Sequence, residues 1–235
     1  MNLEGKNIII TGGSLGIGKE TANNLVERGA NVLVTGRSLD RLKKSFNDSK
    51  VHFLAFDIGD IDKISFNAQQ CLNLLDNRVD VLINNAGIGV RRSIENLNYR
   101  DFIDVFNVNV FGLSLFTKEI IPLMKKQKKG SIINIGSTAS LKGYKNGSIY
   151  ASSKFAVRCL TQCWQAELRP YNIRVCQINP SEVTTAFGSP DRIERDEVHN
   201  KLTSKEISHA IISALEMNNR GFINELNVWA TNPFD

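Results

Sequence analysis

Short apolar runs alternate with amphipathic stretches along the whole 235-residue chain. In Ile8-Ile9-Ile10 and in Val81-Leu82-Ile83 the apolar residues are consecutive, which is typical of parallel strands covered on both faces. Strands that alternate with helices through right-handed crossovers form a doubly wound parallel sheet. The alternation therefore predicts an α/β protein with about seven mainly parallel strands flanked by helices.

Turn residues between the runs give approximate bounds for each element. The expected strands are Asn7–Thr11, Asn31–Thr35, Val51–Asp57, Val79–Asn84, Gly130–Gly136, Ile173–Asn179 and Glu225–Trp229. The expected helices are about Ile17–Arg28, Ile61–Asn77, Tyr99–Gln127, Tyr150–Arg169 and Ser204–Met217. With no repeat or linker in the sequence, residues 1–235 are predicted to form a single domain. The polar segment Ser181–Lys201 follows a strand end, a place typical of a substrate-covering loop.

Composition and charge argue against several classes of function. Hydrophobic residues make up 42% and charged residues 23%, as in ordinary soluble globular proteins, and the formal net charge is +5. The basic run Lys125–Lys129 falls at an expected helix end, where cations complement the helix dipole, so it indicates no nucleic-acid site. No apolar run is long enough to cross a membrane. The expected partner is a small molecule.

Cysteines and histidines show no metal-ligand spacing. The four cysteines include no Cys-x-x-Cys pair, and Cys159 and Cys163, one helical turn apart, are expected to be small core residues. The three histidines are scattered along the chain. No metal is therefore expected, and free thiols without a signal peptide favour a reducing, cytoplasmic location.

A glycine-rich turn links the first expected strand to the first helix. Glycines there permit close backbone approach to a pyrophosphate, and the helix N-terminus offers its dipole and free N–H groups. The spacing is Gly-x-x-x-Gly-x-Gly rather than the commoner Gly-x-Gly-x-x-Gly. Its place between strand and helix predicts a Rossmann dinucleotide site. The candidate contacts are Thr11, Gly12, Ser14, Gly16, Ile17 and Gly18.

The ends of the second and third strands bear on the choice of cofactor. NAD-binding sheets usually carry an acidic residue after the second strand, whereas this chain has Arg37, which suits a 2′-phosphate, and Ser38. This favours NADP(H) over NAD(H), although Arg37 could also be an exposed loop cation. At the third strand end, Asp57, followed by Ile58, could accept a hydrogen bond from the adenine amino group or cap the next helix.

Two further segments combine asparagine with backbone that can approach a ligand. Asn84-Asn85-Ala86-Gly87 ends the fourth strand and could contact a cofactor or simply form a turn. Asn109 is a polar residue inside a long apolar helix, so it needs a partner, and a local helix bend with a bound water is one solution.

Tyr150 and Lys154 are four residues apart on an expected helix, and Ser137 lies thirteen residues upstream. Residues at this spacing share a helix face, so the ammonium can lie beside the phenol and lower its pKa from about 10. Ser137 could hydrogen-bond the same substrate oxygen. The three residues describe a proton donor for a carbonyl, although Tyr-x-x-x-Lys alone also arises by chance on amphipathic helices.

Together these motifs resemble the short-chain dehydrogenase/reductase family, and the resemblance covers essentially the whole chain. It implies that Tyr150 is the general acid or base, that Lys154 lowers its pKa and binds the nicotinamide ribose, and that Ser137 orients the carbonyl. It further implies that Asn109 holds a water linked to Lys154. The resemblance also places Pro180, Val183 and Thr185 around the nicotinamide, and it puts Ser181 where the family usually has glycine.

The spacing up to Pro180 is similar to that of 3-oxoacyl-(acyl-carrier-protein) reductases, whereas the C-terminal segment is more similar to general carbonyl or alcohol reductases. The leading hypothesis is thus a reversible NADP(H)-dependent carbonyl reductase. An acyl-carrier reductase and a non-enzymatic NADP(H)-binding sensor are the alternatives. By resemblance, the helices Tyr99–Gln127 and Tyr150–Arg169 would pair between subunits of a homodimer or homotetramer. The loops that would select the substrate carry no readable chemical signature.

Overall fold

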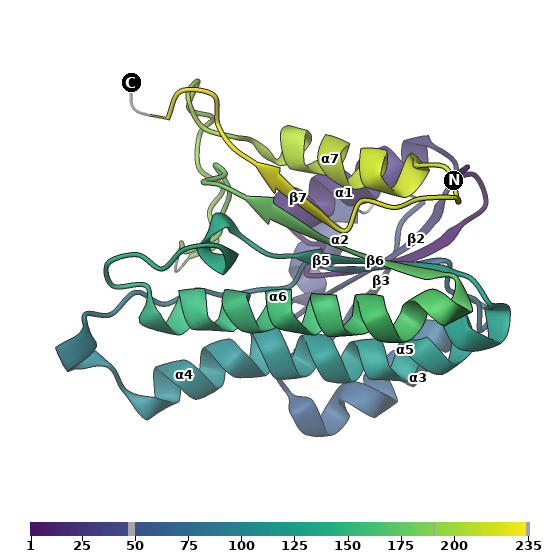
Figure 1. Cartoon of the computed structure of the whole chain (residues 1–235), viewed down its shortest axis with the longest axis horizontal. Helices are drawn as coiled ribbons and strands as arrows, with labels where there is room; N and C mark the ends of the chain where they lie inside the picture. Colours follow the sequence, from purple (N-terminus) through teal and green to yellow (C-terminus); the bar gives the residue numbers. More distant parts are fainter. Residues whose placement is uncertain (47–49, 190, 234–235) are drawn as a thin grey trace.

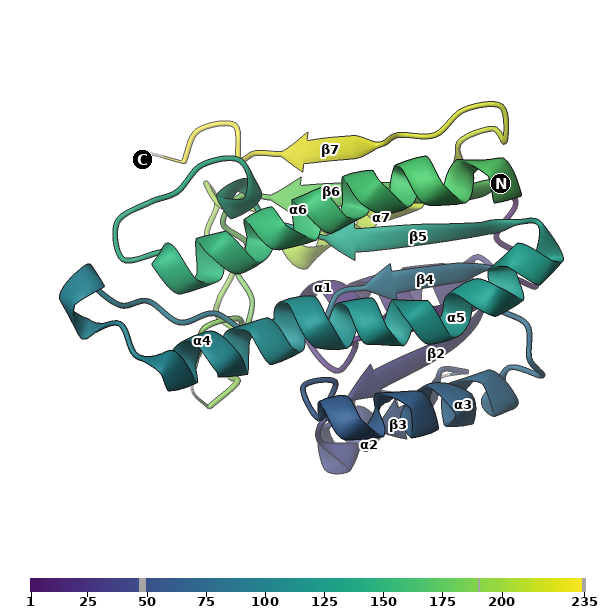
Figure 2. The same cartoon turned by 60° about the horizontal axis from the view of Figure 1, so that its bottom comes forward.

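The computed structural model describes residues 1–46, 50–189 and 191–233. Its seven strands form one sheet in the order β3-β2-β1-β4-β5-β6-β7, and each neighbouring pair is parallel. The strands are β1 Asn7–Thr11, β2 Asn31–Gly36, β3 His52–Ala55, β4 Val81–Asn84, β5 Gly130–Ile135, β6 Ile173–Pro180 and β7 Glu225–Val228. Their carboxyl ends meet along one edge of the molecule (Figure 2). The predicted doubly wound sheet is confirmed.

Helices cover both faces of the sheet, α1, α2 and α7 on one side and α3 to α6 on the other (Figure 1). The α-helices are α1 Gly16–Glu27, α2 Leu39–Phe46, α3 Ile64–Leu74, α4 Tyr99–Phe106, α5 Leu113–Gln127, α6 Ser148–Leu168 and α7 Ser204–Glu216. The short 3-10 turns are Ile61–Lys63, Ile94–Asn96, Thr138–Ser140 and Arg169–Tyr171. In the described part of the chain, no helix combines the length and the apolar character that crossing a membrane requires.

Alternate side chains of the buried strands serve two separate hydrophobic cores. Ile8 and Ile10 of β1 pack with α1, α2 and α7, whereas Ile9 packs with α3 and α5. All three side chains are fully buried. The unbroken apolar runs in the sequence therefore follow from helices on both faces, since neither side of a central strand meets water.

Two helices differ from the expected pattern. No helix was expected between the second and third strands, but α2 lies there. Only Leu42 and Phe46 of this helix are buried, so its apolar pattern is short. The expected helix Tyr99–Gln127 is interrupted by a π-helical segment, Asn107–Gly112, between α4 and α5. Such π-segments frequently mark functional sites.

The prediction that Cys159 and Cys163 are core residues is wrong. Both thiols are free and exposed. The face of α6 that is buried carries Lys154, Val157 and Thr161, and the two cysteines lie on the opposite side of the helix. One helical turn of spacing shows that two residues share a face, but it cannot show which face is covered.

Candidate active site

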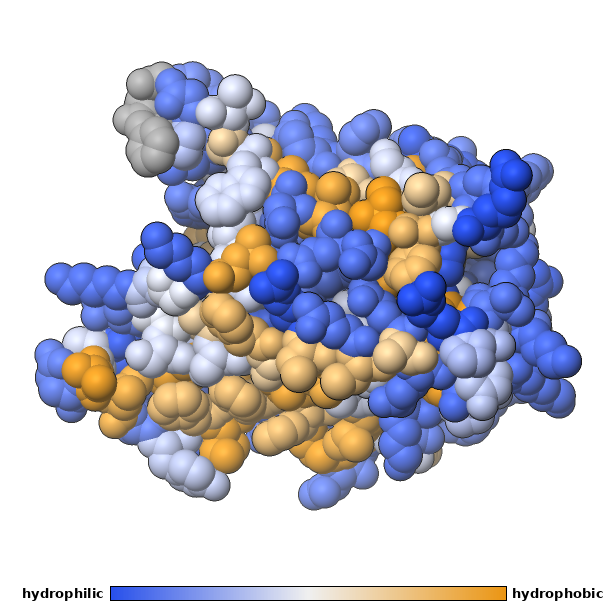
Figure 3. Space-filling view, viewed as in Figure 1, coloured by the Kyte–Doolittle hydropathy of each residue, from blue (hydrophilic) through white to orange (hydrophobic). Residues whose placement is uncertain are grey.

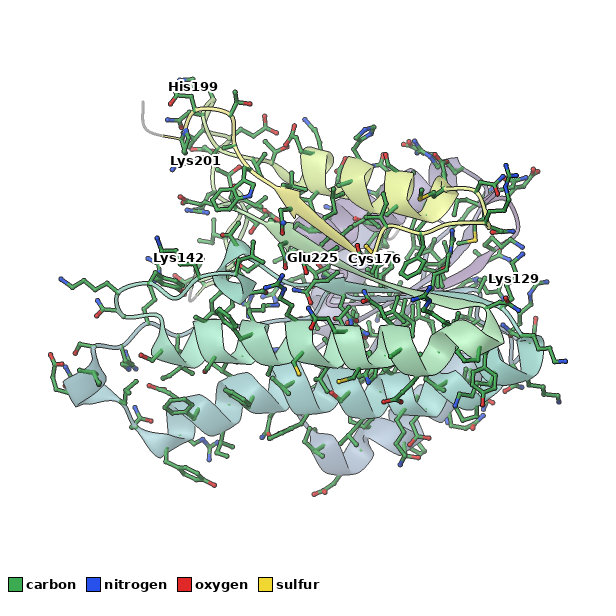
Figure 4. All side chains as sticks on the ribbon, in the orientation of Figure 1. Lys129, Lys142, Cys176, His199, Lys201 and Glu225 are labelled. Atoms are coloured by element: carbon green, nitrogen blue, oxygen red, sulfur yellow. The ribbon has the colours of Figure 1, made fainter. Side chains whose placement is uncertain are left out.

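A cleft of about 1100 Å³ opens where the strands end. In Figure 4, Lys142 lies at the end of the molecule toward which the strands point, and Lys129, just before β5, lies at the opposite end. The surface is hollowed at that end between the C-terminal segment and the helices below it (Figure 3). The predicted residues that line the cleft are Gly12, Ser14, Gly16, Ile17, Arg37, Asp57, Ile58, Asn85, Ala86, Gly87, Ser137, Tyr150, Lys154, Pro180, Val183 and Thr185. Thr11, Gly18, Ser38 and Asn109, which were also predicted, are not among its lining residues.

The glycine turn is interlocked with the end of β4. Gly12 has a positive φ of 68°, and a Cβ there would lie 2.7 Å from the Ala86 Cα. A Cβ on Gly18 would lie 2.6 Å from the Asn85 amide nitrogen. Side chains at either position would force the two segments apart. The atoms they would meet are the Ala86 backbone and the hydrogen-bonded side-chain amide of Asn85, neither of which can move aside easily. Gly18 thus packs against the turn and the end of β4, and it does not line the cleft.

Thr11 holds the two segments together through hydrogen bonds. Its hydroxyl accepts from the backbone N–H groups of Asn85 and Ala86, each at 3.1 Å. The Asn85 amide in turn donates to the carbonyls of Thr11 and Gly12 at 3.0 and 2.8 Å. These contacts fix the floor of the cleft beside the start of α1, where helix N–H groups can bind an anion.

Positive charge gathers at the end of the cleft formed by β2 and β3. Arg37 lies 3.9 Å from the Asp57 carboxylate, and both side chains are about half exposed. The other Asp57 oxygen accepts a hydrogen bond from the Gly59 N–H at 2.8 Å. The Ser38 hydroxyl accepts from the Arg41 N–H at 3.2 Å, so it is committed to the start of α2. An arginine beside β2 and a carboxylate beside β3 can hold a phosphorylated adenosine.

Ser137, Tyr150 and Lys154 come together at the other end of the cleft. Ser137 precedes a short 3-10 turn after β5, and Tyr150 and Lys154 lie in the first turns of α6. The Ser137 hydroxyl lies near the Tyr150 phenol and lowers its pKa, and the Tyr150 ring packs on Phe187, with 5.6 Å between ring centroids. A carbonyl oxygen placed in this part of the cleft would meet two hydroxyl groups.

The direction of the Tyr150 pKa differs from the expectation. Burial of the phenol raises its pKa to about 12, although the hydrogen bond from Ser137 acts in the opposite sense. Burial lowers the pKa of Lys154 to about 8. The Lys154 Nζ lies 5.8 Å from the centre of the Tyr150 ring and donates to the Ile135 carbonyl at 2.7 Å. Four-residue spacing brought the two side chains together, but desolvation is the main influence on the pKa of each.

Asn109 lies in the π-helical segment, and its side chain is fully used. Its amide donates to the Ile88 carbonyl at 2.9 Å and to the Ser153 hydroxyl at 3.0 Å. Its oxygen accepts from the Ile88 N–H at 2.9 Å. The predicted local distortion of the helix is present. A water held at this position would therefore use the irregular backbone rather than the Asn109 amide.

Comparison with known protein families matches residues 6–196 to the family described as short chain dehydrogenase. This match covers most of the chain. The protein belongs to the short-chain dehydrogenase family. The predicted family membership is thus confirmed.

Individual relatives of this short-chain dehydrogenase differ in name and length. A 3-ketodihydrosphingosine reductase from Bacteroides thetaiotaomicron is 36% identical over 77% of this chain, which spans only 65% of that relative. An NADP-dependent 3-hydroxy acid dehydrogenase from Schizosaccharomyces pombe is 31% identical, with 91% of this chain and 88% of the relative covered. An alcohol dehydrogenase from Thermococcus sibiricus, solved with 5-hydroxy-NADP, is 26% identical and superposes with a TM-score of 0.89 over 97% of each chain.

The segment after β6 departs from the usual family sequence at Ser181, and the structure gives this serine a local role. Its N–H donates to the Val228 carbonyl at 2.8 Å, and its hydroxyl accepts from the Ala230 N–H at 3.2 Å. The serine therefore ties the end of β6 to the C-terminal segment. Beyond it, a Cβ on Gly16 would lie 3.1 Å from the Thr185 methyl group, so this short-chain dehydrogenase closes the cleft tightly over its glycine turn.

Sequence reasoning missed several cleft residues of this short-chain dehydrogenase. Arg41 lines the cleft from the unexpected helix α2, and Arg192 and Arg195 line it from the loop before α7. Arg91 and Lys142 also line the cleft. An arginine two or three residues after a helix start carries no sequence signal of its own, and only the packing of α2 brings Arg41 to the cleft.

Proposed function

We propose that the protein is an NADP(H)-dependent oxidoreductase that reduces a carbonyl to an alcohol and can run in reverse. The observation that carries this proposal is that Ser137 and Tyr150 line the same cleft as the glycine turn, with Lys154 buried beside them. A bound nicotinamide cofactor supplies the hydride. The chain itself supplies a proton donor, a second hydrogen bond and an enclosed site.

Each residue has a distinct part in the proton transfer. With its pKa raised to about 12, Tyr150 is a neutral phenol at neutral pH and can donate a proton to the substrate oxygen during reduction. Ser137 donates a hydrogen bond to that oxygen and stabilises the negative charge that develops there. Lys154, with its pKa lowered to about 8, is still mostly protonated at neutral pH and would stabilise the phenolate left on Tyr150.

The cleft fits a phosphorylated dinucleotide. The turn around Gly12 and Gly16 is closed to side chains, as close approach of a diphosphate requires. Arg37, beside Asp57 at the end of the cleft formed by β2 and β3, would bind the 2′-phosphate. The relatives named for NADP support the same cofactor. Arg37 and Asp57 would hold the adenosine end, Asn85 and Gly87 the middle, and Pro180, Val183 and Thr185 the nicotinamide end.

Charge at the substrate side favours a carbonyl compound that also carries an anionic group. Arg91 and Lys142 line this part of the cleft and are exposed, and the Arg91 guanidinium lies over the Tyr144 ring at 5.9 Å. Glu182 is already paired with Arg195 and Lys201 at 3.2 and 3.1 Å. The relative named as a 3-hydroxy acid dehydrogenase supports a carboxylate-bearing substrate.

Turnover of a substrate panel tests the proposed function. NADPH oxidation is followed by absorbance with neutral ketones, aldehydes, 3-oxo acids and 3-oxoacyl thioesters. We expect turnover that Tyr150→Phe reduces by about 10³-fold or more while NADPH binding is retained. If Tyr150→Phe keeps most of the activity, the assignment of the acid is wrong. Tight NADPH binding without turnover of any class would favour the sensor instead.

A subunit interface is proposed on the outer face of α4, α5 and α6. Apolar residues gather over these helices in Figure 3, and Phe111 and Phe155 are 45% and 43% exposed. Exposed apolar patches of this kind mark interaction surfaces. A homodimer or homotetramer that pairs these helices would cover the patch. Sedimentation of the native protein and of Phe155→Asp tests this proposal, since the charged variant is expected to dissociate.

A further inference from the structure

Three guanidinium groups gather at the adenosine end of the cleft. Arg37 follows β2, Arg41 lies in α2, and Arg192 comes from the loop between β6 and α7, about 150 residues away in sequence; all three line the cleft. Partial burial, together with the positive charges of Arg37 and Arg41, lowers the pKa of Arg192. The three cations therefore share one cleft, and their charges oppose one another.

Their own chain offers little compensation for this charge. Arg37 has Asp57 at 3.9 Å, at the limit of an ion pair. Among residues 1–46, 50–189 and 191–233, no carboxylate lies within ion-pair distance of Arg41 or Arg192. Like charges held together without a counter-ion destabilise the unliganded protein, and a bound anion removes that repulsion. The cluster has the chemistry of a phosphate site.

We propose that Arg192 is a specificity residue that binds the 2′-phosphate of NADPH from the loop and completes a site begun by Arg37 and Arg41. This inference rests on the proposed NADP(H)-dependent function. A phosphate site on β2 alone would not be connected to the reactive residues. Arg192 provides this connection, because it belongs to the same loop as Phe187, which packs on Tyr150. The 2′-phosphate would thus order the loop over the reactive end, and NADH, which lacks that phosphate, would not.

Direct binding tests the proposal without turnover. NADPH and NADH are titrated against wild type, Arg192→Gln and Arg37→Gln, with Arg220→Gln as a charge-matched control on an exposed residue outside the cleft. For Arg192→Gln we expect NADPH affinity to fall by about tenfold or more. NADH affinity should stay within about twofold, because NADH has no 2′-phosphate and so loses no charge-assisted hydrogen bond when Arg192 is replaced.

The outcomes separate this inference from the proposed function. If Arg37→Gln abolishes the preference for NADPH over NADH and Arg192→Gln leaves it intact, the role of Arg192 is wrong. The proposed cofactor would still stand in that case. A wild-type protein that binds NADPH no tighter than NADH would overturn both the inference and the proposed cofactor. Hydrogen–deuterium exchange gives a second measurement. NADPH should protect residues 186–201 more than NADH does, and Arg192→Gln should remove the difference; equal protection by both cofactors in the wild type would contradict the proposal.

A hydrogen bond in the same loop carries a second, independent inference. The Glu194 Oε1 accepts from the Gly16 N–H at 2.7 Å, and Gly16 is the first residue of α1. The N-terminal N–H groups of a helix bind anions, and here the anion is a carboxylate of the chain itself. We infer that Glu194 is a placeholder that the diphosphate of either cofactor must displace.

Removal of the placeholder should tighten cofactor binding. We expect Glu194→Ala to raise the affinity for NADPH and NADH by the same factor, about threefold to tenfold. Glu194→Gln, which keeps an acceptor but loses the charge, should fall between wild type and Glu194→Ala. Glu27→Gln, at the exposed far end of α1, is the control. Unchanged or weakened binding in Glu194→Ala would refute the placeholder, and a gain confined to one cofactor would do the same.

Discussion

The two ends of the cleft are built in opposite ways. At the reactive end, Lys154 and Asn109 are 5% and 1% exposed, and their polar atoms are committed to Ile135, Ile88 and Ser153. At the adenosine end, Arg37 is 54% exposed and has one distant carboxylate partner. The first end depends on buried geometry, where losing one atom is costly, and the second depends on charge, which solvent screens.

The largest effect is expected from the loss of a hydroxyl at the reactive end. Ser137→Ala should lower turnover by about 10²-fold to 10³-fold, because it removes a hydrogen bond to the developing oxyanion. It should also raise the Tyr150 pKa further, since the Ser137 hydrogen bond lowers that pKa. Steady-state rates and cofactor titration measure the effect. Ser140→Ala is a comparison variant, because the Ser140 hydroxyl contacts the Ser137 backbone N–H. A loss below about threefold would mean that this end is less exacting than its burial indicates.

A smaller effect is expected from reversing a charge at the adenosine end. Arg37→Asp should weaken NADPH binding by about tenfold to a hundredfold and NADH binding much less, because only NADPH carries the 2′-phosphate. Fluorescence titration of both cofactors provides the measurement. Equal losses for the two cofactors would refute a role for Arg37 at the phosphate and would remove the contrast between the two ends.

The buried lysine should also appear in the pH dependence of stability. The Lys154 pKa falls from 10.5 to about 8 on folding, so between these values the unfolded chain holds a proton that the folded chain has lost. The contribution of Lys154 to stability therefore rises with pH in this window, by up to about 1.4 kcal/mol per pH unit. Chemical denaturation of wild type and Lys154→Met across this range should show a stability difference that shifts in favour of the wild type as pH rises. Parallel curves would mean that the lysine keeps its ordinary pKa.

The smallest expected effect comes from salt. Raising ionic strength from about 0.05 M to 0.5 M should weaken NADPH binding several-fold at the exposed arginines and should change the NADH affinity less. The turnover number at saturating cofactor should be nearly constant, because the reactive end is shielded from ions. A turnover number that falls as steeply as NADPH affinity would show that the two ends share one electrostatic environment.

The site could be predicted from sequence where local backbone rules dictate residue type. Gly12 is needed because its φ is positive and Ala86 lies against it. A glycine motif after a strand therefore predicts this turn directly. Tyr150 and Lys154 were brought onto one side of α6 by helical spacing alone. Arg41 and Arg192 could not be found in this way, because one lies on a weakly patterned helix and the other on a polar loop.

The parallel sheet and the family could be predicted from sequence alone, because strand burial on both faces and glycine turns are local requirements of the chain. The folded structure was needed for the rest. It showed that burial raises the Tyr150 pKa although a lysine is four residues away, and that Cys159 and Cys163 face outward. It also placed Arg192 of a distant loop in the cleft and Glu194 of the same loop against the start of α1. Desolvation and charge clustering depend on which residues from distant parts of the chain pack around a group. The spacing of residues along the sequence therefore does not predict them.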